Sequence, residues 1–236
     1  MLEIAKKSFV HIYNLCPNGS CFDIKKQAAV KEAALENNGV ALGVVHPLYC
    51  DSYRFYPWDG DLFVPRYVTR SDYDTYKKGL VNYISNFHGP ILGFLGNSLD
   101  SFGSLGVLGW LEKIKIQAPS TFIILETLGG NPLPLFSKEV AGSEFDVGEV
   151  VMSNNKIHIF KEDAIKYWQF LRLILAFVGI DKIILTGEQY VPCGTSSLGC
   201  VGDAARQLRS VGFNARVLTK HTFPNVRMPY NKPVSF

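Results

Sequence analysis

The chain has 236 residues and a mass of 26.3 kDa, which is the size of one large α/β domain. Hydrophobic residues make up 47% of the chain and charged residues 19%, and this composition excludes a disordered protein, a coiled coil and a charge-driven scaffold. The formal net charge is +3 and lysine and arginine are scattered along the chain, so the sequence predicts no nucleic-acid partner.

The apolar segments do not have the features of a membrane anchor or an export signal. The longest one, residues 170–180, contains Arg172 and is shorter than the roughly 18 apolar residues that a transmembrane helix needs. The first residues lack the basic-then-apolar order of a signal peptide. We therefore expect a cytoplasmic protein with no membrane partner.

The cysteine count also fits a reducing compartment, because an odd number without an export signal does not suggest a disulfide framework. The five cysteines are Cys16, Cys21, Cys50, Cys193 and Cys200. The first two flank a turn, but no second Cys or His pair at ligand spacing accompanies them. The sequence predicts neither a metal site nor a bound cofactor.

Taken in chain order, helical and strand-like segments alternate. Periodic apolar residues and end signals predict helices at residues 23–36, 71–87, 162–178 and 198–211, and a glycine-weakened helix at 97–115. Apolar runs predict strands at residues 40–45, 91–95, 121–125, 182–186 and 215–218, and short strands at 149–152 and 157–160. An aromatic-rich segment, residues 48–70, is predicted as a long loop.

The main strand segments are continuous apolar runs, which is typical of strands buried on both faces. Their alternation with helices predicts an α/β fold with a mostly parallel, doubly wound sheet and helices on both faces. We expect one domain over residues 1–236, with a divergent N-terminal segment at 1–38 and an extended tail at 224–236.

Reactive side chains follow three of the predicted strands. In a doubly wound sheet, ligands bind beyond the carboxyl ends of the strands. His46 directly follows the first predicted strand, and Asp51 lies five residues further along the chain. Lys156 follows the first of the two short strands, and the loop after the next long strand leads to Cys200. These side chains are the candidates for a functional site.

Cys200 lies in the first turn of the helix predicted at 198–211. The unpaired N–H groups and the positive end of the helix dipole at such a position stabilise a thiolate, so the residue is a candidate nucleophile. The alternative is a core residue, because Cys200 is in register with Ala204 and Leu208 and buried cysteine is a common small hydrophobe.

Three motifs in residues 148–222 occur together in a known family. They are Lys156-Ile-His-Ile-Phe160, Val178-Gly-Ile-Asp-Lys-Ile-Ile-Leu-Thr-Gly187 and Cys200-Val-Gly-Asp-Ala-Ala-Arg206 followed by Gly212-Phe213. With these motifs the segment resembles the C-terminal half of the isochorismatase-like cysteine hydrolases, which include nicotinamidases, N-carbamoylsarcosine amidases and isochorismatases. The resemblance implies the isochorismatase-type α/β fold and hydrolysis of an amide or a related small carbonyl compound.

The family acts through a Cys/Lys/Asp triad. The resemblance assigns Cys200 to the nucleophile and Lys156 to the lysine, with Lys161 as a less well placed substitute. The triad aspartate belongs at the end of the first strand, where this chain has His46. Asp51 lies just beyond that strand, so the resemblance leaves two candidates, Asp51 and His46, for the group that moves protons.

The chain departs from the family pattern at further points. In the family, fewer residues separate the glycine that corresponds to Gly187 from the nucleophilic cysteine, and this shorter spacing would select Cys193. Because the resemblance assigns Cys200 to the nucleophile, residues 194–199 are interpreted as an insertion in the loop that normally builds the oxyanion hole. Residues 98–134 have no counterpart in the family pattern, and the metal-binding motif of nicotinamidases is missing.

Two other functions stay open. One is a protein of the same fold that has lost catalysis and serves in binding or interaction, which the missing aspartate and the altered loop favour. The other is nucleotide or cofactor binding at Gly129-Gly130 or at residues 194–199, although neither loop has the spacing of a phosphate-binding motif. The leading prediction is a cysteine hydrolase with a small-molecule substrate and no cofactor, and it leaves open whether the chain forms a homo-oligomer.

Overall fold

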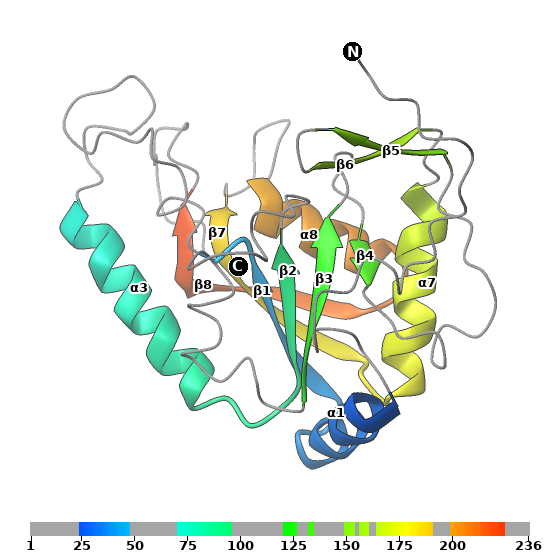
Figure 1. The fold of residues 1–236 in the computed structure, drawn as a ribbon. Coiled ribbons are helices and arrows are strands. Elements are labelled where there is room, and N and C mark those ends of the chain that lie inside the picture. Colours follow the sequence, from blue (N-terminus) through cyan, green and yellow to red (C-terminus); the bar gives the residue numbers. More distant parts are fainter. Residues whose placement is uncertain are drawn as a thin grey trace.

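The computed structural model describes residues 24–47, 70–95, 120–126, 132–134, 149–153, 156–160, 164–190 and 199–224. These residues form a six-stranded sheet with helices on both faces and a separate two-stranded hairpin (Figure 1). Some predictions concern residues outside these ranges, namely Asp51, Cys193, the helix at 97–115, the start of the N-terminal segment and the tail. They stay predictions.

Five of the six described strands in the main sheet run parallel. The strands are β1 (Val40–Val45), β2 (Ile91–Leu95), β3 (Thr121–Glu126), β4 (Pro132–Pro134), β7 (Lys182–Tyr190) and β8 (Asn214–Pro224). Their order is β4-β3-β2-β1-β7-β8, and the short edge strand β4 is antiparallel to β3. This arrangement confirms the predicted α/β fold with a mostly parallel sheet.

The described helices cover both faces of the sheet. They are α1 (Ile24–Glu36), α3 (Arg70–Ser85), α7 (Ala164–Phe177) and α8 (Gly199–Ser210). Successive side chains of a strand point to opposite faces. Ala41 and Val45 of β1 accordingly belong to a core cluster with α1, α7 and α8, whereas Leu42 and Val44 pack with Leu80 of α3. β1 is thus buried from both sides, which explains its uninterrupted apolar sequence.

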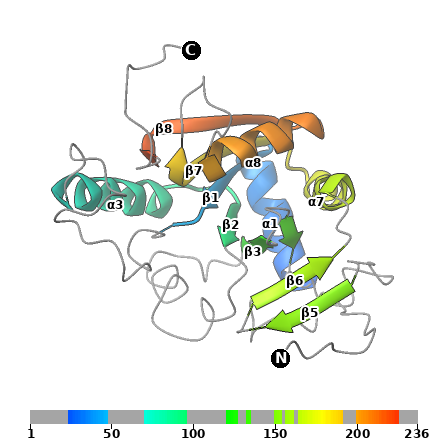
Figure 2. The ribbon, with the colours of Figure 1, turned by 90° about the horizontal axis from the view of Figure 1, so that it is seen from above.

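Residues 149–160 depart from the predicted sheet. β5 (Glu149–Ser153) and β6 (Lys156–Phe160) pair antiparallel with each other and lie outside the main sheet. The link between them is too short for a parallel crossover and permits only an antiparallel hairpin. Figure 2 shows the hairpin beside β3 and β4, with α8 on the side of β7 and β8. The expectation that the strand before Lys156 belongs to the main sheet is therefore wrong.

β7 and β8 are both longer than predicted. β7 continues to Tyr190 and β8 to Pro224. β8 pairs with β7 up to Val217 and resumes at Thr222, so residues 218–221 bulge out of the ladder. The sequence predicts only the first part of β8 because the pattern of apolar residues is interrupted at this bulge.

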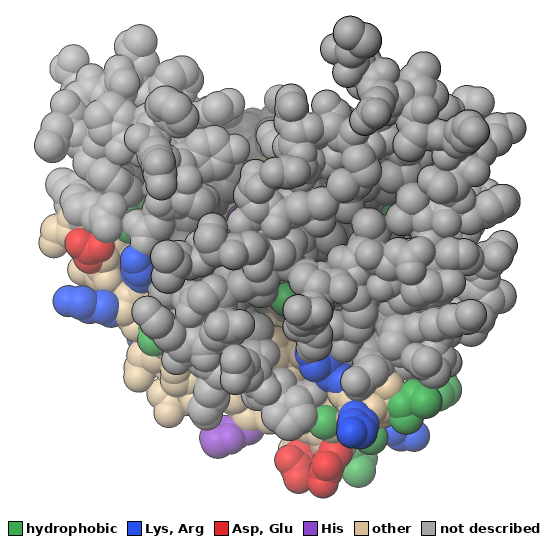
Figure 3. All heavy atoms as spheres, viewed as in Figure 1, with side chains coloured by type: hydrophobic (Ala, Val, Ile, Leu, Met, Phe, Trp, Pro, Cys, Tyr) green, Lys and Arg blue, Asp and Glu red, His purple; other side chains and the backbone are tan. Residues whose placement is uncertain are grey.

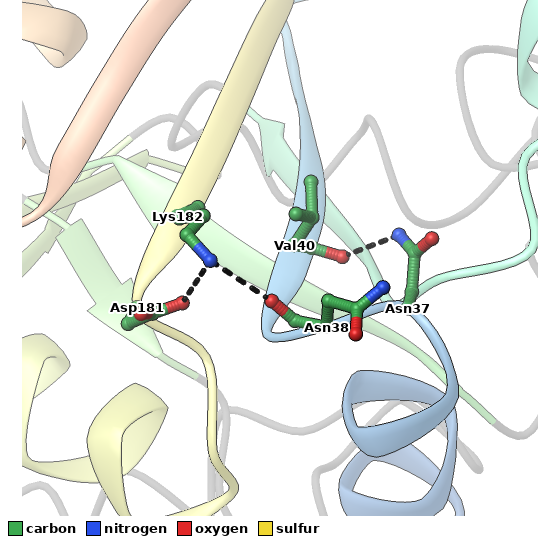
Figure 4. A network of polar contacts seen from close by, with 5 residues as sticks. All are labelled: Asn37, Asn38, Val40, Asp181 and Lys182. Carbon is green, nitrogen blue, oxygen red and sulfur yellow. Dashed lines mark hydrogen bonds and ion pairs between the residues drawn. The ribbon is translucent and has the colours of Figure 1, made fainter.

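A polar network closes the amino ends of β1 and β7 (Figure 4). Lys182 Nζ donates a 3.2 Å hydrogen bond to Asn38 O and lies 3.8 Å from Asp181 Oδ1. Asn37 Nδ2 donates to Val40 O at 2.8 Å. These contacts hold the turn after α1 against the start of β7. They lie at the end of the sheet opposite to the carboxyl ends of the parallel strands.

Charged side chains of both signs lie close together near α1 and α3 on the face shown in Figure 3. On this face, the described charges therefore do not build a patch of one sign. None of the helices within the described ranges is long and apolar enough to span a membrane.

Candidate functional site

The direction in which the chain builds the sheet reverses at β1. The chain first adds β2 and β3 on one side of β1 and later adds β7 and β8 on the other side. In open α/β sheets, ligands bind at such a reversal, outside the carboxyl ends of the strands. The candidate site is therefore the region at the carboxyl ends of β1 and β7 (Figure 1).

His46 directly follows β1 and has an unusual backbone conformation. Its φ is 44°, in the left-handed region that non-glycine residues seldom adopt. Its backbone N–H donates a 2.8 Å hydrogen bond to Phe94 O of β2, and both ring nitrogens are buried. Backbone strain of this kind is concentrated at functional sites, which makes His46 a candidate site residue.

Gly187 brings β7 against β1 at the same level of the sheet. It pairs with Val45, the last residue of β1, and has a φ of 124°. A Cβ at this position would lie 1.9 Å from Val45 O, so only glycine permits the close approach. His46 and Glu188 are the next residues of the two adjacent segments, and they consequently occupy neighbouring positions at the carboxyl end.

Glu188 is a fully buried carboxylate at this level. Its exposed fraction is 0%, and Tyr73 Oη from α3 donates a 2.8 Å hydrogen bond to its Oε1. Tyr73 is also buried, and the ring of Phe223 from β8 meets it edge-on with the centroids 5.1 Å apart. Burial of a carboxylate is unfavourable unless hydrogen bonds or charges compensate it. The Tyr73 phenol supplies such a hydrogen bond.

Glu188 is not among the site residues predicted from the sequence. The signal that points to it is an acidic residue placed two positions after an apolar strand segment, at the carboxyl end where ligands bind. Its partner Tyr73 has no such signal, because the two residues are 115 positions apart in the chain and only the fold brings them together.

Two buried threonine hydroxyls hold the bulge of β8, one from β7 and one from β8 itself. Thr186 Oγ1 donates a hydrogen bond to His221 O, and Thr222 Oγ1 donates to Leu218 O at 2.7 Å. Both threonines are buried. Side-chain hydrogen bonds therefore hold the bulge. It lies opposite Thr186, the residue of β7 that precedes Gly187.

His221, on this bulge, packs against α3. Its ring stacks on Tyr83 with the centroids 4.9 Å apart and an interplanar angle of 25°, and it lies next to Gly79. Burial, together with the positive charge of Lys220, lowers the pKa of His221 from its ordinary value of 6.5. His221 is thus a neutral aromatic partner of α3 near pH 7.

Cys200 is the second residue of α8, which confirms its predicted position in the first turn of a helix. The helix begins at Gly199, which is buried and has a φ of 68°. Cys200 carries a reduced thiol, is half-buried and packs against the core cluster that includes Val201. This position is compatible with both predicted roles, because the thiol is at a helix N-terminus and also contacts the core.

The structure places two of the four predicted site residues at the carboxyl end of the main sheet. Cys200 begins the helix that follows β7, and His46 follows β1. Lys156 is the first residue of β6, in the hairpin beside β3 and β4, and only its place in that strand is described. Asp51 lies outside the described residues. The catalytic role of each residue stays a prediction.

The described groups at this end of the sheet are a thiol, an imidazole, a carboxylate and a phenol. They belong to Cys200, His46, Glu188 and Tyr73. Within the described ranges, no three His, Cys, Asp or Glu side chains are grouped so that they could hold a metal ion. Glu188 and Tyr73 belong to the face of the sheet that α3 covers, whereas Cys200 packs against the core cluster on the α8 face, so the described contacts do not bring the thiol and the carboxylate together.

Comparisons of the chain with protein-family models, with curated proteins and with solved structures found no match. The resemblance to the isochorismatase-like hydrolases therefore depends on the motifs in residues 148–222. The residues at the carboxyl ends of β1 and β7 provide the structural basis for a functional proposal.

Proposed function

We propose that the protein is a cysteine hydrolase of isochorismatase type that acts on an amide or a related small carbonyl compound. The observation that carries this proposal is the position of Cys200 in the first turn of α8, the helix that follows β7 at the reversal of the sheet. The motifs around Lys156, Gly187 and Cys200 support the same family, and the strained conformation of His46 supports a site at this end.

The start of α8 provides the electrostatic environment for such a reaction. The first N–H groups of a helix have no acceptor within the helix, and together with the helix dipole they favour a negative charge beside them. In this proposal they stabilise the thiolate of Cys200 and then the oxyanion that forms when the thiolate adds to the carbonyl carbon. The same donors serve both steps because Cys200 Sγ and the oxyanion are close together in the tetrahedral intermediate.

The reaction then proceeds through a thioester. Cys200 Sγ forms a bond to the carbonyl carbon, the C–N bond breaks, and the amine leaves with a proton. Water adds to the thioester, the C–S bond breaks, and the acid is released. Lys156 is the candidate for stabilising the thiolate and the developing charge, and His46 and Asp51 are the candidates for moving the protons.

One observation favours a second function. Cys200 packs against the core cluster on the α8 side of the sheet, which is the environment of a structural cysteine. A protein of the same fold with an inert cysteine would bind a small molecule or a partner at the strand ends without hydrolysing it. The chemical reactivity of Cys200 distinguishes the two functions.

Timed labelling with iodoacetamide measures this reactivity without knowledge of the substrate. The native protein is exposed to a limiting amount of reagent near neutral pH, and peptide mass mapping follows each of the five cysteines. We expect Cys200 to be alkylated at least about tenfold faster than Cys16 or Cys21, because a thiolate reacts and a thiol does not.

The Cys200→Ser variant is the control that assigns the labelled peptide. Labelling of Cys200 only after unfolding, or no faster than that of the other cysteines, contradicts the hydrolase and favours the binding protein.

A further inference from the structure

The outer side of α7 is apolar, which sets this helix apart from α3 and α8. A helix that covers one face of a sheet needs only one apolar side, and its other side is normally polar. The residues described as exposed in α3 and α8 follow this rule, because all of them are polar. In α7, by contrast, Ile165, Leu173 and Phe177 are 67%, 68% and 67% exposed.

The packing of α7 against the sheet does not use these three residues. The inner side of the helix buries Trp168, Leu171 and Leu175 in the core cluster that α7 shares with α1 and α8. Figure 2 shows α7 at the outer flank of the layer that these three helices form. Burial in the core of one chain therefore does not account for the large apolar residues on the outer side.

The exposed apolar residues lie in one row along the helix. We call this set the α7 row, and its members follow one another at four-residue intervals: Ile165, Gln169, Leu173 and Phe177. Side chains at this spacing form a ridge, and the ridges of two helices interdigitate when the helices cross at about −50°. Because both helices in such a packing use the same spacing, the α7 row is complementary to the α7 row of a second copy.

The α7 row contains no charged side chain. The two charged residues of the helix are Lys166 and Arg172. The Arg172 guanidinium lies 3.3 Å from the position that a Cβ on Gly212 would occupy, beyond the C-terminal end of α8, where the helix dipole attracts a cation. The row therefore offers no counter-charge to a charged peptide. It also lacks the set of Lys and Arg residues with which an amphipathic helix binds an anionic membrane.

The size of the row fits the apolar centre of a dimer interface. The 14 residues of α7 span about 21 Å, and the three large side chains together expose on the order of 300 Å². A stable interface buries about 800 Å² on each partner, and smaller ones are weak. The row can thus supply the centre of an interface whose rim is polar, and the dimer should be reversible.

We propose that two copies of the protein form a twofold-symmetric dimer by packing their α7 rows against each other. In such an interface each copy contributes the same surface, so an uncharged ridge is buried against a surface of matching composition and spacing. The other large hydrophobic residues exposed in the described ranges are Ile24 and Leu35 of α1, which are 11 positions apart and form no such row. This inference is independent of the proposed hydrolase function.

Sedimentation equilibrium of the full chain, at concentrations from about 1 to 200 μM, measures the association. We expect the mean mass to rise from 26.3 kDa towards twice this value, with a dissociation constant in the range of about 1–50 μM. The Leu173→Lys variant places a charge in the row and should raise the dissociation constant at least about tenfold, because the charge would be buried without a partner.

Leu35→Lys is the matched control, because Leu35 is an exposed leucine on a different helix. It makes the same change of residue type and should leave the dissociation constant as in the wild type. Gln169→Lys is a second variant, which adds a charge to the row without removing an apolar side chain, and it tests the proposal if Leu173→Lys does not fold. Circular dichroism and an unfolding curve check the fold of each variant.

A wild type that remains monomeric over the whole concentration range overturns the proposal. If this monomer binds vesicles of phosphatidylcholine and phosphatidylserine, the row is a membrane contact instead. A dimer that is unaffected by the folded row variants also overturns it, because the association then uses another surface. Equal weakening by Leu35→Lys and Leu173→Lys has the same consequence. The reactivity of Cys200 is measured separately, so each of these results leaves the proposed function as it stands.

Discussion

At the scale of single residues, the carboxyl end of the sheet is unusual because it contains positions that few residue types tolerate. His46 has a positive φ although it is not a glycine. Gly187 leaves no space for a Cβ, and Glu188 buries a carboxylate. Each of these features is unfavourable by itself. Their occurrence at three neighbouring positions at the reversal of the sheet is the strongest structural argument for a functional site there.

The substitution Gly187→Ala tests how tightly β1 and β7 are joined. We expect it to lower the free energy of unfolding by about 3 kcal/mol, since the new Cβ would meet Val45 O at 1.9 Å in addition to the strain of a positive φ. Urea unfolding followed by circular dichroism measures the loss.

Gly179→Ala is the matched control. Gly179 has a φ of 83° and no atom within 4 Å of an added Cβ, so this substitution introduces only the backbone strain of about 1 kcal/mol. Equal losses in the two variants would show that β7 does not approach β1 as closely as described.

At the scale of secondary-structure elements, the bulge of β8 is the main connection between α3 and the carboxyl end of the sheet. Thr186 pairs with Val44 of β1 but has no partner in the ladder to β8, and its side chain instead donates a hydrogen bond to His221 O. The His221 ring stacks on Tyr83 of α3. Residues next to Glu188 and its partner Tyr73 are thus held by contacts between β7, β8 and α3.

This connection should weaken in acid. The pKa of His221 in the folded protein is lowered by burial and by Lys220, so the unfolded chain binds the proton more readily. The stabilising contribution of the neutral ring is complete above pH 6.5 and is lost as the pH falls from there towards the lower pKa of the folded state. We expect the wild type to lose more stability between pH 7.5 and 5 than His221→Gln does.

Thermal unfolding at several pH values measures this difference. The exposed His88 provides the control, because His88→Gln should retain the pH dependence of the wild type. A wild type and a His221→Gln variant whose melting temperatures fall in parallel would contradict the account.

At the scale of the whole molecule, the fold was predictable from the sequence to a considerable extent. Apolar strands such as β1 are buried on both faces, and this burial requires an uninterrupted apolar run that the sequence displays directly. The first turn of α8 was predictable for a similar reason, since Gly199 and the spacing to Gly212 mark the two ends of that helix.

The site was less predictable because its parts come from distant segments. The pairing of Tyr73 with Glu188 depends on the packing of α3 against β7 and β8, and no local pattern encodes it. The left-handed conformation of His46 also has no signal in the residue type. The hairpin around Lys156 could have been predicted from its short link, since parallel strands need a longer connection.

The central claim is that Cys200 is a nucleophile that forms a covalent acyl intermediate. The most direct measurement uses p-nitrophenyl acetate, an activated ester, followed by quenching and peptide mass mapping of the wild type and of Cys200→Ala. We predict an acetyl group on the Cys200 peptide that appears early and disappears on further incubation, and none at this position in the variant. An acetyl group that is absent from Cys200, or spread equally over all five cysteines, would contradict the account.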